Sequence, residues 1–167
     1  RNVCNQMAEK NAHDKEDSLD KDTRKKLVKV VTKMMDHLNA NIKDNAEVIK
    51  EGLQDTPLCL VEDGVILTRA NQLVYEMPKL MENDLRPYLY QAPRNLANYD
   101  ELLHLLGAQD ETTFDQLAMV LKGIRDQCKE SKMNPNDKNK AHAATGYLFR
   151  LLLSTEGKCP ITVQELF

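Results

Sequence analysis

The stretch "LRPYLYQAPRNLANYDELLHLLGA" (residues 85–108) joins a proline-interrupted aromatic segment to a leucine-rich helical pattern. It holds three of the chain's five tyrosines, Tyr88, Tyr90 and Tyr99, beside Pro87 and Pro93. Proline stops a helix from propagating, and tyrosine adds a large contact area with few rotatable bonds. This Pro/Tyr segment is therefore suited to a structural brace across helix ends, to a groove for a partner peptide, or to a catalytic loop.

The C-terminal half of the stretch has the pattern of a short helix. Asn98 with Glu101 resembles a capping box, and Gly107 is well placed to end the helix. Leucines supply its apolar face. Across this helix and the next two, the residues expected to carry the core are Leu102, Leu106, Leu117, Leu121, Leu148 and Leu152.

Two further helices are predicted downstream. Thr112 or Thr113 can cap the first, and Asn134 with Pro135 marks the start of the second, which Gly157 is placed to end. Apolar residues recur at helical spacing in both. The expected inward-facing residues are Phe114, Leu117, Leu121, Ile124 and Cys128 in the first and Ala141, Ala144, Leu148, Leu151 and Leu152 in the second.

Upstream, a helical pattern runs from Asp22 to Ile42, with Asp22 or Thr23 as its cap. A second, shorter helix is expected from Asp44 to about Gly52.

Between these helices and the Pro/Tyr segment, "LCLV" and "VIL" flank the pair Asp63-Gly64. Both central residues of a type I′ turn need positive φ, so an Asp-Gly pair between apolar runs predicts a β-hairpin. Residues 78–95 carry three prolines, which predicts extended or turned chain with a short helical turn at "KLMEND".

The composition fits a soluble globular chain, with 29% charged and 41% apolar residues. Aromatic residues make up 5%, so the core must be mainly Leu, Val, Ile and Met. We predict a mainly α fold: a helical bundle of five or six helices with one small β-hairpin and an extended Pro/Tyr-rich connector. Residues 1–21 are expected to be a polar lead-in or tail, and residues 22–167 a single helical domain with the hairpin near 58–67.

The N-terminus, "RNVCNQMAEKNAHDKED", lacks an initiator Met and an apolar signal core, which suggests a piece of a longer protein. Cys4, Cys59, Cys128 and Cys159 show no C-x-x-C spacing, as expected of reduced thiols in a cytoplasmic protein. The net charge of -3 and the lack of a long apolar run give no reason to expect nucleic-acid or membrane binding.

No pattern supports a particular reaction. His13, His37, His104 and His142 stand apart rather than at ligand spacing, so no metal site is expected. Neither G-x-S-x-G nor a glycine-rich phosphate loop occurs. Basic residues gather in residues 24–33 directly after an acidic run, which we interpret as a solvated helix face rather than a nucleic-acid stripe. We therefore expect no enzymatic activity and no cofactor.

Four features together resemble the helical part of the repeats in the sacsin family, whose members are very large cytosolic chaperone-like proteins. They are the strand pair around Asp-Gly, the segment "RPYLYQAP", the helix "YDELLHLLG" and the helix "FDQLAMVL". The resemblance covers about residues 53–153, and residues 1–50 match only as a helical lead-in. It implies a helical spacer or interaction module. The family's ATP-site patterns N-x-x-D-A and D-x-G-x-G do not occur, so ATP binding is not carried over.

We therefore expect a non-enzymatic scaffold or protein-interaction module of a large cytoplasmic chaperone-like protein, acting as a rigid connector or a docking surface. Its expected partners are proteins or clients, other domains of the same chain and co-chaperones. The candidate interaction surface is Tyr88, Tyr90, Tyr99 and His104, although a brace is favoured over a groove there. One alternative is a small helical ligand-binding or enzymatic domain with its site near Tyr88–His104. Another is a repeat unit that self-associates through exposed methionines: Met34, Met35, Met77 and Met81.

Overall fold

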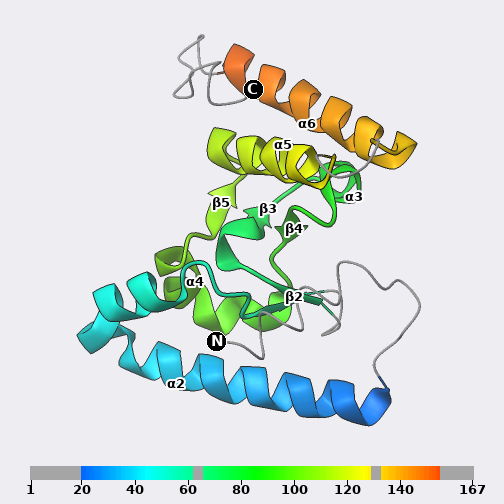
Figure 1. The fold of residues 1–167 in the computed structure, drawn as a ribbon. Helices are drawn as coiled ribbons and strands as arrows, with labels where there is room; N and C mark the ends of the chain where they lie inside the picture. Colours follow the sequence, from blue (N-terminus) through cyan, green and yellow to red (C-terminus); the bar gives the residue numbers. More distant parts are fainter. Residues whose placement is uncertain (1–19, 62–65, 129–132, 155–167) are drawn as a thin grey trace. The chain divides into compact units, whose positions relative to one another are not determined.

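The computed structural model describes residues 20–61, 66–128 and 133–154 (Figure 1). These residues form the α-helices α2 to α6, two 3-10 helices and five short strands. The predicted fold class, mainly α with a small β-hairpin, is confirmed.

The chain packs as two compact units. The first contains the described residues up to Leu73 together with Ala92–Ala108. The second contains Val74–Gln91 and the described residues from Gln109 onward. The Pro/Tyr segment is therefore divided between the units at Gln91. The assignment of residues 22–167 to a single domain stays a prediction.

In the first unit, helix α2 (Lys21–Leu53) begins at Asp20, whose side chain accepts hydrogen bonds from the backbone N–H groups of Asp22 and Thr23. The prediction that Asp22 or Thr23 is the cap is wrong, because Asp20 is the last non-helical residue before the first turn. Asn45 has non-helical φ and ψ of -133° and 25° and kinks the helix. The predicted separate helix from Asp44 is thus the part of α2 beyond this kink.

The predicted hairpin is confirmed in the first unit. Strand β1 (Cys59–Val61) pairs antiparallel with β2 (Ile66–Thr68), and Leu60 lies opposite Leu67. The turn at Asp63-Gly64 lies outside the described residues. A short 3-10 helix, η1 (Ala70–Gln72), follows β2.

The start of helix α4 (Asp100–Leu105) differs from the prediction. The 3-10 helix η2 (Arg94–Tyr99) runs directly into α4, and Tyr99 precedes it without a side-chain capping bond. The predicted capping box of Asn98 and Glu101 is therefore wrong, because no free helix end exists at Asn98.

The end of α4 is as predicted. Gly107 has φ of 106°, a left-handed conformation that glycine adopts without steric cost. Its N–H donates to the carbonyl of His104, and the N–H of Ala108 donates to the carbonyl of Leu103. These two bonds form the Schellman motif that ends many helices.

The second unit contains a three-stranded sheet that the sequence did not predict. Strand β3 (Leu73–Glu76) lies between β4 (Tyr90–Gln91) and β5 (Gln109–Glu111), and β3 and β5 are parallel with Val74 opposite Gln109. Strands of two to four residues are too short to show an alternating pattern. Between β3 and β4, helix α3 (Lys79–Leu85) confirms the helical turn predicted at "KLMEND".

Helices α5 (Phe114–Cys128) and α6 (Pro135–Ser154) complete the second unit. The hydroxyl of Thr113 accepts from the N–H of Gln116, whose side chain accepts from the N–H of Thr113. This is a capping box, and it confirms Thr113 as the cap. Asn134 caps α6 by accepting from the N–H of Asp137, with Pro135 as the first helical residue. The predicted stop at Gly157 lies outside the described residues.

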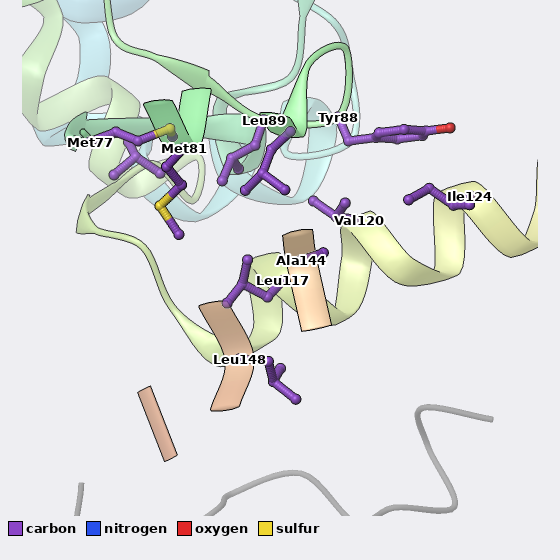
Figure 2. Close-up of a cluster of buried hydrophobic side chains, with 11 residues drawn as sticks. Met77, Met81, Tyr88, Leu89, Leu117, Val120, Ile124, Ala144 and Leu148 are labelled. Atoms are coloured by element: carbon purple, nitrogen blue, oxygen red, sulfur yellow. The ribbon is translucent and has the colours of Figure 1, made fainter. Parts of the chain in front are cut away.

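A cluster of buried side chains joins β3, α3, α5 and α6 (Figure 2). From α5 it takes Leu117, Val120 and Ile124, whereas Leu121 is only half-buried at its edge. The observed inward face of α5 is thus rotated away from the predicted face, towards Val120. Of the six predicted core leucines, Leu102, Leu106, Leu117 and Leu148 are buried, and Leu121 and Leu152 are half-buried.

The prediction that four methionines form an exposed surface for self-association is wrong for three of them. Met77 and Met81 are buried in this cluster, and Met35 is buried in the first unit, whereas Met34 is partly buried. Unbranched methionine side chains here fill the core beside leucines.

The observed face of α5 makes a testable distinction between Leu117 and Leu121. Leu117→Ala should lower the free energy of unfolding by roughly 2–5 kcal/mol, because it leaves a cavity at a fully buried site. Leu121→Ala should cost less, about 1 kcal/mol, because that side chain is only partly buried at the edge of the cluster. Urea denaturation of both variants and the parent measures the difference, and equal losses would contradict this orientation of α5.

Candidate interaction site

The four residues predicted to form an interaction surface are divided between the two units. Tyr88 and Tyr90 belong to the second unit, and Tyr99 and His104 belong to the first. All three tyrosines are buried, whereas the His104 side chain is partly exposed. Burial favours the structural role for the tyrosines, and their use as a surface for a partner stays a prediction.

Tyr88 follows α3 and lies against α5. Its hydroxyl donates to the Oε1 atom of Gln127, and Figure 2 shows the Tyr88 side chain near Ile124. The ring also covers Gly123, where an added Cβ would stand 2.9 Å from Cδ1 of the ring. A glycine in the middle of α5 therefore lets the aromatic ring approach the helix backbone.

Tyr90 is held by a network of charged and polar groups in the same unit. The guanidinium of Arg86 lies over its ring, 5.8 Å from the centroid. Arg86 also forms an ion pair with Glu82, with 2.6 Å between Nη2 and Oε1. The same oxygen of Glu82 accepts from the backbone N–H of Gln91 at 3.3 Å. Together these contacts fix the path of the chain from α3 into β4.

Tyr99 performs the corresponding role in the first unit. Its hydroxyl donates to Oδ1 of Asp36 on α2 at 2.7 Å. Nearby, the side-chain amide of Asn39 donates to the carbonyl of Asn98 at 3.4 Å. The two bonds attach η2 to the middle of α2.

His104 lies one helical turn from Asp100 on α4. Its Nδ1 atom is 2.9 Å from the backbone carbonyl of Asp100 and 3.2 Å from Oδ1 of the Asp100 carboxylate. Both side chains are partly or largely exposed, at 35% and 62%. An exposed pair at i and i+4 is a common helix-stabilising contact.

Tyr147 is a further member of this group, and sequence reasoning missed it. Its hydroxyl donates to Oδ2 of Asp84 at 2.9 Å, which joins α6 to α3. Arg150 covers its ring, with the guanidinium carbon 5.6 Å from the centroid. The sequence shows only a tyrosine at the edge of an apolar stripe, because its acceptor lies 63 residues away.

The hydroxyls of Tyr88, Tyr99 and Tyr147 share one electrostatic property: a raised pKa. Burial is the main cause for Tyr88, whose pKa rises to about 12, and for Tyr147. For Tyr99 the main cause is its hydrogen bond to the Asp36 carboxylate. A raised pKa keeps each hydroxyl protonated as a donor at neutral pH, which suits a packing contact and not a nucleophile or base.

Cys59 is a buried free cysteine in the first unit. Burial raises the pKa of the Cys59 thiol to about 12, which suppresses the reactive thiolate. Within residues 20–61, 66–128 and 133–154, no three His, Cys, Asp or Glu side chains gather in a group that could hold a metal ion. No helix in the same part of the chain is long and apolar enough to cross a membrane.

The contact between Tyr88 and Gly123 can be tested with two glycine substitutions. Alanine favours a helix over glycine by about 1 kcal/mol, so Gly146→Ala, where no atom of the described residues lies within 4 Å of the added Cβ, should stabilise the protein. Gly123→Ala should instead destabilise it by about 1–3 kcal/mol, because the methyl group meets an anchored ring. Urea denaturation compares the two. Stabilisation by both substitutions would show that the ring does not press on α5.

Comparison with known proteins gives one informative likeness. The chain is 26% identical to sacsin from Homo sapiens over 152 residues. The aligned part is 91% of this chain and 3% of sacsin. No protein-family model matches the chain, and no solved structure matches it significantly. At this identity the similarity indicates a sacsin-related sequence.

Proposed function

We propose that this chain is a non-enzymatic helical module of a large, cytoplasmic, chaperone-like protein, in which it docks protein partners or clients or rigidly connects neighbouring parts. The similarity to sacsin along 91% of the chain is the observation that carries the proposal. The chain spans 3% of that relative's length, so it corresponds to a small part of such a protein. Within it, "YDELLHLLG" and "FDQLAMVL" resemble the helical part of a sacsin repeat.

The use of the tyrosines supports this proposal. The tyrosines that give the Pro/Tyr segment its distinct sequence form hydrogen bonds within the chain: Tyr88 with Gln127, and Tyr99 with Asp36. Side chains committed to internal contacts hold a shape in place. A module that functions through a defined shape and surface needs such contacts, whereas a catalytic loop needs reactive groups directed at a substrate.

Exposed apolar side chains support the docking role. Large hydrophobic residues exposed by about half or more include Val30, Val48, Leu80, Met133, Phe149 and Leu153. Single exposed apolar residues are common, but protein partners bind through apolar surface of this kind where it is grouped.

A ligand screen separates this proposal from a small ligand-binding or enzymatic domain with a site near Tyr88–His104. We expect the melting temperature to stay unchanged with ATP and Mg²⁺, Zn²⁺, Ca²⁺, nicotinamide and flavin cofactors, and haem. A ligand present at 100 times its Kd would add about 2.7 kcal/mol of stability. For a chain of this size that corresponds to a rise of roughly 5–10 °C. Differential scanning fluorimetry detects such a rise, which would favour the enzymatic or ligand-binding alternative.

A second measurement tests client docking directly. Firefly luciferase diluted from guanidinium chloride aggregates because its apolar surface is exposed, and an equimolar amount of this chain should lower its light scattering by about half. Hen lysozyme at the same concentration is the control for an inert folded protein. Scattering equal to that with lysozyme would exclude client docking and leave the connector role.

A further inference from the structure

Helix α6 presents two different faces. Ala144 and Leu148 are buried in the cluster of the second unit (Figure 2). On the other side Phe149 is 59% exposed and Leu153 is 83% exposed. Because each residue advances the helix by 100°, these two side chains lie on the same side of α6, one turn apart.

Gly146 extends this apolar side and packs against no other element in the described part of the chain. It is exposed in the middle of α6, and no atom of the described residues lies within 4 Å of the position that a Cβ would occupy. Glycine is the least favourable residue inside a helix apart from proline, so its presence calls for a reason. A missing side chain lets a second backbone come close.

The spacing of these residues suits a helical partner. Gly146, Phe149 and Leu153 are separated by three and four residues, as are the a and d positions of two packed helices. We name Gly146, Phe149 and Leu153 the outer stripe of α6. A helix laid along this stripe would cover both apolar side chains and cross α6 at the glycine.

The charges near the outer stripe indicate which kind of partner helix would bind there. Arg150 is exposed beside Phe149 and Leu153 on one side of the stripe, and Lys138 is exposed on the other side of its line, more than two turns before Gly146. The acidic residue of α6, Asp137, lies in the first turn and accepts a hydrogen bond from the Asn134 side chain. A second copy of α6 would bring these cations together, whereas a helix with acidic borders would pair with them.

We propose that the outer stripe of α6 is a docking site for an acidic amphipathic helix of a protein partner. This inference rests on the proposed function as an interaction module, and it names the surface and the chemistry of the partner. Apolar side chains of the partner cover Phe149 and Leu153, its backbone packs at Gly146, and its carboxylates pair with Lys138 and Arg150.

The test uses the full chain and a synthetic, fluorescein-labelled helical peptide of about three heptads, with leucines on one face and glutamates on both borders. A control peptide has the same leucines with lysines in place of the glutamates. Fluorescence anisotropy should show saturable binding of the glutamate peptide and binding of the lysine peptide that is weaker by about tenfold or more.

Matched variants locate the site. Phe149→Ser and Leu153→Ser should each weaken binding of the glutamate peptide by about tenfold. Leu80→Ser changes a side chain that is 70% exposed on α3 and should leave binding unchanged. Phe149→Ser should also leave the melting temperature within about 1 °C, because an uncovered side chain adds little to folding.

Each contrary result overturns the proposal. No binding of the glutamate peptide, equal binding of both peptides, or an equal loss in Leu80→Ser would remove the acidic helix as the specific occupant. A concentration-dependent dimer in light scattering that disappears in Phe149→Ser would make a second copy the occupant. A clear fall in melting temperature in Phe149→Ser would show that Phe149 packs within the chain and is not available to a partner. None of these results would change the outcome of the ligand screen, so the proposed function is tested separately from this docking site.

Discussion

A buried tyrosine hydroxyl needs a hydrogen-bond acceptor, because leaving it unpaired away from water costs about 1–3 kcal/mol. In this chain the buried Tyr88 and Tyr99 and the partly buried Tyr147 have acceptors far along the sequence: Gln127 is 39 residues from Tyr88, Asp36 is 63 from Tyr99, and Asp84 is 63 from Tyr147. Each acceptor is on a helix. Every bond therefore joins elements that form locally, and the tertiary arrangement within each unit depends on the acceptor being in reach.

These directional bonds matter because the rest of the core is aliphatic. Aliphatic side chains of similar volume can exchange partners at small cost, so a leucine-rich cluster alone permits several packings of its helices. A hydroxyl bond tolerates only a narrow range of distance and angle. Two helices in the second unit are constrained in this way, α5 by Tyr88 and α6 by Tyr147. Gly123 adds a steric condition, since the ring of Tyr88 fits only against a residue with no side chain.

Several features decided by neighbouring residues could be predicted from the sequence, although the starts of α2 and α4 were placed wrongly. The helix start at Thr112 or Thr113, the Asn134-Pro135 start and the stop at Gly107 depend on local backbone groups, and the sequence predicts all three. Features decided by distant residues were missed, including the β4-β3-β5 sheet and the bond between Tyr147 and Asp84. The inward face of α5 was placed towards Leu121 instead of Val120, because both rows of residues are apolar. For the candidate site, sequence reasoning found the Pro/Tyr segment but not the partners that explain its tyrosines.

The same bonds account for the exposed apolar side of α6. Rotating the helix to bury Phe149 and Leu153 would remove more apolar surface from water, by about 1.5–3 kcal/mol for each side chain. That rotation would also carry the Tyr147 hydroxyl away from Asp84 and take Ala144 and Leu148 out of the cluster. The unpaired hydroxyl and the loss of these buried contacts would offset the gain. The observed orientation of α6 therefore keeps the Tyr147 hydrogen bond and the buried contacts of its inner side. The outer stripe is the apolar surface that this orientation leaves in water.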